Sequence, residues 1–116
     1  MAINDILVNM VENGTESLSI EFKTWLDLNQ SHGKAKLIKG LIALYNNNGG
    51  YFVIGINDKT GSVDETSAPE DIYSSYHPDL IQGLVGKYSS LSFEIKVEFV
   101  KTNEAQVPII CVPDGV

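Results

Sequence analysis

The sequence contains no arginine, a single cysteine and no long apolar segment. All eight basic residues are lysines, so the bidentate guanidinium contacts that many proteins make to phosphate and guanine cannot form here. The lone Cys111 excludes an internal disulfide and any zinc site built on several cysteines. No apolar run approaches the roughly 18 residues that a membrane helix needs, and the first residues lack the features of a secretory signal. We therefore expect a cytoplasmic protein without a membrane partner.

Positive charge is also scarce. The 116 residues carry 15 acidic and 8 basic side chains, which gives a formal net charge of −7 at pH 7. This balance opposes an extended electrostatic surface for nucleic acids. We therefore expect any binding of RNA or DNA to be weak, with a Kd for duplex DNA above roughly 10 μM at physiological salt. A site that uses carboxylates or holds a metal ion fits the charge better.

The residue pattern predicts a single α+β domain with a central mixed β-sheet of about four strands and helices packed on it. Apolar residues at helical spacing indicate helices, while period-two alternation and continuous apolar runs indicate strands. Polar segments without clear periodicity, over residues 24–33 and 62–77, are expected to be loops. The helices are expected over residues 2–12, 33–45 and 78–88, and the strands over 18–23, 51–56, 93–99 and 107–112.

Three more specific expectations accompany this prediction. Pro108 suggests that the last strand lies at an edge of the sheet or that it begins there. The chain stops at residues 113–116, directly after a predicted strand and within a turn signal, so we expect residues 1–116 to be the N-terminal part of a longer protein. Five apolar residues are expected to be almost fully buried: Leu41, Ile42, Val53, Ile54 and Ile56.

Common catalytic motifs are absent from the sequence. It has no phosphate-binding loop, dinucleotide-binding glycine motif, zinc-protease motif or serine-hydrolase elbow. His32 and His77 are far apart in predicted loops, which favours exposed loop residues over metal ligands. Cys111 lies in an apolar run, which favours a buried core thiol over a nucleophile.

Acidic residues form the candidate site that remains. Glu16 and Glu21 flank and occupy the first predicted strand, and Asp58 follows the second. Converging carboxylates can hold Mg²⁺ or Mn²⁺, because these ions prefer hard oxygen ligands. A spacing of five would put the two glutamates on opposite faces of a regular strand, so convergence requires a bend near Ser17. A solvated polar surface explains the same three residues.

Two further features have alternative explanations. Lys23 shares the predicted face of Glu21, where it could hold a phosphate or form an exposed ion pair worth less than about 1 kcal/mol. Residues 46–50, Asn-Asn-Asn-Gly-Gly, could form a backbone anion site. An ordinary helix end followed by a tight turn explains the same run.

Taken together, these segments resemble the Schlafen/AlbA_2 domain family. The first, Glu-Ser-Leu-Ser-Ile-Glu-Phe-Lys, resembles the family's E-S-x-x-x-E-F-K opening. Residues 39–50 resemble the family's helix, which usually ends A-F-A-N-T-x-G-G. Leu44-Tyr45 stands here in place of the usual Phe-Ala. Residues 51–58 resemble the family's G-x-[IL]-x-[IL]-G-[IV]-x-D strand and turn, and residues 107–113 resemble a later strand. These segments are residues 16–23, 39–50, 51–58 and 107–113.

The resemblance implies a nucleic-acid-processing domain. In animal Schlafen proteins two glutamates and an aspartate form a metal-dependent ribonuclease site that acts on tRNA and rRNA. Matched position by position, these acids fall on Glu16, Glu21 and Asp58. The resemblance thus implies an Mg²⁺- or Mn²⁺-dependent endoribonuclease with these three residues as catalytic metal ligands and Lys23 near the scissile phosphate.

The same resemblance leaves other functions open. Bacterial members are described as DNA-binding or transcription-regulator domains, and some prokaryotic members are fused to effector modules in antiphage defence. This chain could therefore be a non-catalytic DNA- or RNA-binding regulatory module. It could also be a protein-interaction or homo-oligomerisation domain that keeps the fold without activity. The acidic charge favours the ribonuclease or the interaction domain over the DNA-binding module.

Overall fold

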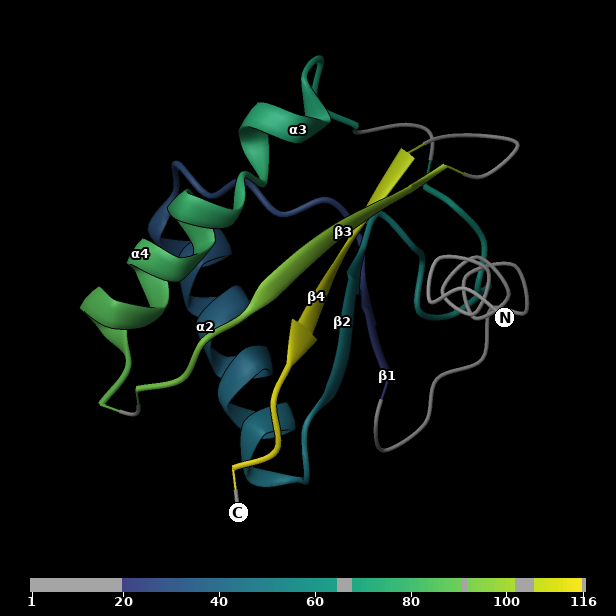
Figure 1. The fold of residues 1–116 in the computed structure, drawn as a ribbon. Helices are drawn as coiled ribbons and strands as arrows, with labels where there is room; N and C mark the ends of the chain where they lie inside the picture. Colours follow the sequence, from purple (N-terminus) through teal and green to yellow (C-terminus); the bar gives the residue numbers. More distant parts are fainter. Residues whose placement is uncertain (1–19, 65–67, 91, 102–105, 116) are drawn as a thin grey trace.

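The computed structural model describes residues 20–64, 68–90, 92–101 and 106–115 (Figure 1). The helix expected over residues 2–12 and the candidate ligand Glu16 lie outside these ranges. No helix in the described ranges is long and apolar enough to cross a membrane. The described elements are, in order, β1 (Ile20–Lys23), α2 (Ser31–Asn46), β2 (Gly50–Ile54), α3 (Ile72–Ser75), α4 (Pro78–Tyr88), β3 (Lys96–Lys101) and β4 (Gln106–Val112).

The described strands form one mixed sheet in the order β1-β2-β4-β3. β1 runs parallel to β2, with Glu21 opposite Phe52, and β4 runs antiparallel to both of its neighbours. Helix α2 makes the crossover that a parallel pair requires. The expected α+β architecture, a mixed four-stranded sheet with helices packed on it, is therefore confirmed.

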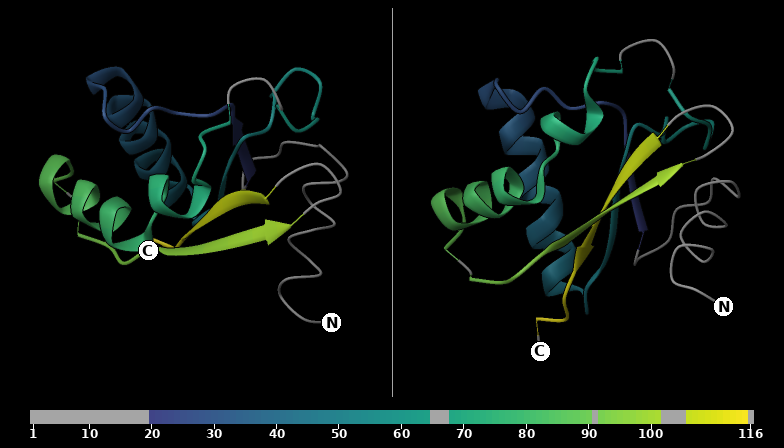
Figure 2. Two further views of the ribbon diagram at one scale, coloured as in Figure 1. Left: turned by 90° about the horizontal axis from the view of Figure 1, so that it is seen from above. Right: turned by 45° about the horizontal axis from the view of Figure 1, so that its top comes forward.

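Strand β2 is buried on both faces, as its continuous apolar sequence predicts. Phe52 and Ile54 belong to a core cluster that includes residues of α2 and α4, whereas Val53 belongs to a second cluster on the other face. Figure 2 shows α2 and α4 on the same side of the sheet. The apolar faces of both helices therefore pack against one face of the sheet.

Helix α2 lies close against the sheet at Gly40. A Cβ atom at this position would overlap the ring of Phe52, which is fully buried. Glycine inside a helix costs about 1 kcal/mol relative to alanine. Here the close contact between helix and strand accounts for its presence.

The run at residues 46–50 is a helix end followed by a tight turn. The backbone amides of Asn47 and Gly49 both donate to the carbonyl of Leu44, at 3.0 and 2.7 Å. Asn48 and Gly49 adopt positive φ values of 71° and 81°. A Cβ on Gly49 would also lie 2.7 Å from the carbonyl oxygen of Val112. Of the two explanations for this run, the backbone hydrogen bonds support the helix end.

Several element boundaries differ from the prediction by one to three residues; β2, for example, is Gly50–Ile54 instead of the expected 51–56. Helix α2 begins at Ser31, two residues earlier than expected. Strand β3 begins at Lys96, although the alternation begins at Phe93. The side chain of Gln82 on α4 donates to the carbonyl of Phe93 and accepts from the amide of Ile95, both at 2.9 Å. This side chain fastens the segment before β3 to helix α4.

The expected surface loop over residues 62–77 is wrong in its second half. This half contains helix α3, and Tyr76 directly after it is 1% exposed. The Tyr76 hydroxyl donates to the carbonyl of Leu26 at 2.7 Å and accepts from the amide of Leu26 at 3.1 Å. Tyr76 therefore fixes the loop before α2 to the core.

Two expectations about single residues need correction. β4 lies inside the sheet, so Pro108 is not on an edge strand. The paired part of β2 ends opposite Ile109, and Pro108 therefore lies near the start of β4, where its missing N–H costs no bond to β2. Ile42 is half-buried, whereas the other four residues of the expected core are fully buried: Leu41, Val53, Ile54 and Ile56.

Replacing Tyr76 with phenylalanine is expected to remove an alkaline loss of stability. Burial raises the pKa of Tyr76 from the ordinary value of 10.0 to about 12. The folded state therefore disfavours the ionised ring, so its stabilising contribution is complete below about pH 10 and falls as the pH rises from about 10 to about 12. At neutral pH the variant should lose about 1–3 kcal/mol, because both Leu26 backbone groups lose a buried partner.

Urea unfolding of both proteins at several pH values measures this effect. The difference in unfolding free energy between the wild type and Tyr76→Phe should shrink as the pH rises through this range. A difference that stays constant would contradict the assignment, because lysine titration affects both proteins equally.

Candidate functional site

A groove lies between the edge strand β1 and helix α2. Glu21 and Lys23 pair with Phe52 and Ile54, whose side chains belong to the core on the α2 side of the sheet. Residues paired across neighbouring strands share a face, so Glu21 and Lys23 point to the same side as α2. The groove has a volume of about 480 Å³ and is lined by Glu21, Lys23, Lys36, Lys39, Gly40, Ala43, Leu44 and Asn47.

The described lining of this groove carries three ammonium groups and one carboxylate. The Nζ atom of Lys23 lies 3.4 Å from Oε1 of Glu21, and the two side chains are 35% and 40% exposed. An ion pair this exposed contributes less than about 1 kcal/mol to stability. Lys36 and Lys39 come from α2, which contains no acidic residue. The part of the groove lining that the structure describes is therefore positive, in a chain of net charge −7.

The predicted site residues that the structure describes lie in two different places. Glu21 and Lys23 are together in the groove, where they form the ion pair that their spacing allows. Asp58 is exposed in the turn after β2, where Asn57 Oδ1 accepts from the amide of Lys59 at 2.9 Å. Asp58 is not one of the residues that line the groove. Glu16 lies outside the described residues.

The described residues alone do not complete a site for a divalent metal ion. Within residues 20–64, 68–90, 92–101 and 106–115, no three Asp, Glu, His or Cys side chains gather closely enough to hold one. Among the described residues, Glu21 is the only carboxylate in the groove lining, and the lysines beside it repel a cation. The predicted Mg²⁺ or Mn²⁺ site therefore depends on Glu16 and on the placement of Asp58.

Comparison with known proteins shows the family of this chain. The family model described as Schlafen, AlbA_2 matches residues 16–116. The chain belongs to the Schlafen AlbA_2 family. This match confirms the resemblance seen in the sequence motifs. No curated protein matches the chain.

Two solved structures share the fold of this Schlafen AlbA_2 domain. The DIP2311 protein from Corynebacterium diphtheriae is 16% identical, with a TM-score of 0.65 over 93% of this chain and 25% of its own length. The N-terminal domain of a protein from Nitrosomonas europaea, described as related to the ATP-dependent DNA helicase RecG, is 22% identical. Its TM-score is 0.51 over 98% of this chain and 74% of its own length. The chain thus spans about a quarter of the Corynebacterium protein, and both likenesses show the fold alone.

The Schlafen AlbA_2 groove contains two lysines that the sequence did not single out as site residues. Lys36 and Lys39 lie off the apolar stripe of α2, which favoured a solvent-facing role for them. A signal was nevertheless present, because residues 34–39 carry three lysines on a helix without an acidic residue. Side chains three apart on a helix are neighbours, so Lys36 and Lys39 reach the same groove.

The remaining sequence candidates, two histidines and the cysteine, lie outside the groove of this Schlafen AlbA_2 domain. His32 is exposed but lies in the first turn of α2, not in a loop. His77 caps α4, with Nδ1 accepting from the amide of Asp79 at 3.1 Å. Cys111 is half-buried, and burial raises the pKa of its thiol. The raised pKa keeps the thiol protonated, which opposes a role as a nucleophile.

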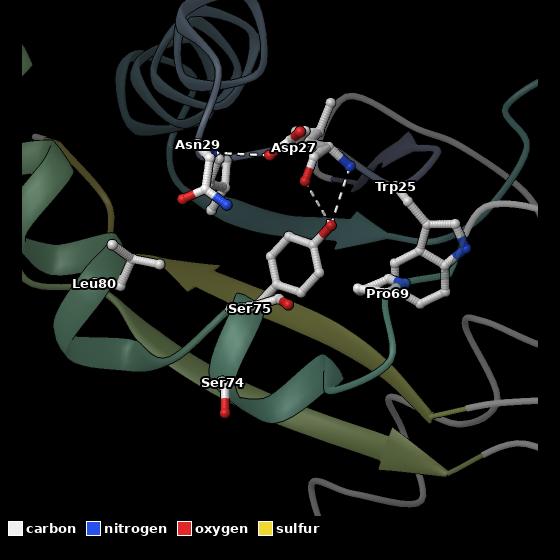
Figure 3. A pocket seen from close by; sticks show the side chains of 10 residues that line it. Trp25, Asp27, Asn29, Pro69, Ser74, Ser75 and Leu80 are labelled. Carbon is white, nitrogen blue, oxygen red and sulfur yellow. Dashed lines mark hydrogen bonds between the residues drawn. The ribbon is translucent and has the colours of Figure 1, made fainter.

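A second cavity of about 600 Å³ lies between the loop before α2 and helices α3 and α4. Figure 3 shows Trp25 and Leu80 at opposite ends of it, with Asp27 and Asn29 between them. The indole nitrogen of Trp25 donates to the carbonyl of Asp64 at 2.5 Å, and the amide of Asn29 donates to Asp27 Oδ1 at 2.9 Å. These bonds order the loop itself, and the cavity contains no lysine. We assign the candidate site to the groove beside β1.

Proposed function

We propose that this Schlafen AlbA_2 domain acts on nucleic acid and holds a phosphodiester backbone in the groove between β1 and α2. The observation that carries the proposal is the gathering of Lys23, Lys36 and Lys39 in one groove of an otherwise acidic protein. A lysine ammonium group binds phosphate as a point charge without a fixed geometry. Backbone contacts of this kind carry no sequence information, so the binding is independent of base sequence.

The strength of this binding follows from the number of lysines. Each phosphate that a lysine neutralises releases counterions, which makes the logarithm of the binding constant fall linearly with the logarithm of salt concentration. Three contacts give a slope of about −2 to −3. The net charge of −7 opposes this attraction, so the affinity is low and depends on salt.

Replacing both Lys36 and Lys39 with glutamine is expected to weaken nucleic-acid binding and to reduce the salt slope by about 2. The matched control is the pair Lys96→Gln and Lys101→Gln on β3, the opposite edge strand of the sheet. Both double variants change the net charge equally. Fluorescence anisotropy of a labelled RNA at several salt concentrations measures the effect.

Two results would contradict the proposal. One is the absence of wild-type binding even at about 50 mM salt, where backbone contacts are strongest. The other is an equal loss of affinity in both double variants, which would show that net charge, not the groove, determines the binding.

A second candidate function is an Mg²⁺- or Mn²⁺-dependent ribonuclease. The position of Glu21 beside the groove lysines favours it, because a phosphodiester held there would lie close to a carboxylate. The activity requires that Glu16 and Asp58 supply further oxygen ligands for the ion. Thermal unfolding with and without Mg²⁺ or Mn²⁺ tests this requirement, since an ion bound to the folded state raises the midpoint.

A further inference from the structure

The groove adjoins another, mostly apolar cavity, distinct from the one beside Trp25, on the other side of Lys39. This cavity has a volume of about 520 Å³ and lies between α2 and the C-terminal end of α4. Lys39 lines both the groove and the cavity, which makes them neighbours. The described lining of the cavity includes no acidic side chain and consists of Ser31, Lys34, Ala35, Ile38, Lys39, Ile42 and Tyr88.

Tyr88 presents an aromatic ring at this cavity. The residue is 49% exposed and is the last residue of α4. The Nζ atoms of Lys87 and Lys34 lie 5.2 and 6.0 Å from the centre of its ring. Tyr73 is exposed to a similar degree, but its ring packs on that of Phe99 with the centres 4.9 Å apart. Tyr88 thus combines an exposed ring with two neighbouring positive charges.

We propose that Tyr88 is a stacking platform for a base of a single-stranded nucleic acid whose backbone is held by the groove lysines. The proposal rests on the proposed function and specifies the class of its substrate. Single strands expose the flat faces of their bases, whereas a duplex buries these faces in its own stack. Proteins that bind single strands combine aromatic platforms with a positively charged groove, as Tyr88 and the lysines do here.

The lining of the cavity fits a base better than a phosphate. Ala35, Ile38 and Ile42 offer apolar surface beside the ring, while Lys34 and Lys39 lie where the backbone of the same strand would pass. An acidic peptide would also complement these lysines. The continuity of the cavity with the groove at Lys39 favours a long anionic strand over such a peptide.

The test uses the 116-residue chain and two labelled probes of equal length, about 12 nucleotides. One is a single-stranded RNA without self-complementarity, and the other is the corresponding duplex. The proteins are the wild type, Tyr88→Ala, Tyr88→Phe and the matched control Tyr73→Ala. Circular dichroism confirms that each variant is folded, and anisotropy at low salt measures each affinity.

Tyr88→Ala is expected to weaken single-strand binding about tenfold and to leave duplex binding unchanged. Tyr88→Phe keeps the ring and should bind like the wild type, and so should Tyr73→Ala. A loss that is equal for both probes, or no loss at all, would overturn the stacking role. Binding of an acidic peptide such as oligoglutamate with the same dependence on Tyr88 would overturn it in favour of a protein partner.

The results separate this inference from the proposed function. If the glutamine variants of Lys36 and Lys39 lose affinity while Tyr88→Ala does not, the groove function stands and the stacking role fails. If the wild type binds neither probe, both fail.

Discussion

Replacing Phe52 with alanine is expected to lower the free energy of unfolding by about 3–5 kcal/mol. The Phe52 ring is fully buried between β2 and α2, against Gly40 of the helix. Its removal takes apolar surface out of the core and leaves a cavity that the backbones of helix and strand cannot close. Urea denaturation followed by the fluorescence of Trp25, the only tryptophan, measures the loss.

The contact between Phe52 and Gly40 also predicts an energetic coupling. Gly40→Ala alone should destabilise the fold by about 1–3 kcal/mol, because the added methyl group meets the buried ring. In the Phe52→Ala background the same methyl group enters the vacated space, and the gain in helix propensity of about 1 kcal/mol then applies. The double variant should therefore be at least as stable as Phe52→Ala.

Val53→Ala is the control for this cycle. Val53 is fully buried on the opposite face of β2, and its truncation should cost about 1–3 kcal/mol. Its effect should add to that of Gly40→Ala, because the two residues share no contact cluster. A Gly40→Ala variant that is more stable than the wild type would show that the helix can move away from the sheet.

Replacing Glu21 with glutamine is expected to abolish RNA cleavage if the domain is a ribonuclease, while RNA binding is kept or becomes tighter. Glutamine preserves the shape of the side chain and removes the one negative charge that the described groove residues place beside the lysines. Lys23 then loses its ion-pair partner at 3.4 Å and becomes available to phosphate. Gel assays of RNA cleavage and anisotropy of the uncleaved RNA separate the two effects.

Controls with other candidate ligands complete this experiment. Glu16→Gln and Asp58→Asn should each stop cleavage as well, and EDTA should stop cleavage by the wild type. Equal cleavage by Glu21→Gln and the wild type, or cleavage in EDTA, would show that the carboxylates are not the catalyst. Weaker binding by Glu21→Gln would contradict the phosphate-binding role of the groove.

Much of the fold follows from the sequence alone, because periodicity reports local backbone geometry. The continuous apolar run identifies β2, and the helical spacing after Pro78 identifies α4. Alternation along β1 correctly places Glu21 and Lys23 on one face. The linked motifs in residues 16–58 identify the family that the family model confirms.

Only the tertiary structure decides which of these elements meet. The position of β4 between β2 and β3, the burial of Tyr76 and the pairing of Gln82 with the segment before β3 all depend on contacts between distant residues. Local patterns contain no information on such contacts, because one amphipathic strand or polar side chain can pair with many partners. The groove also arises from contacts between residues that are distant in the sequence. Lys36 and Lys39 look like solvent-facing residues until the close packing of α2 on β2 at Gly40 brings them beside Glu21 and Lys23.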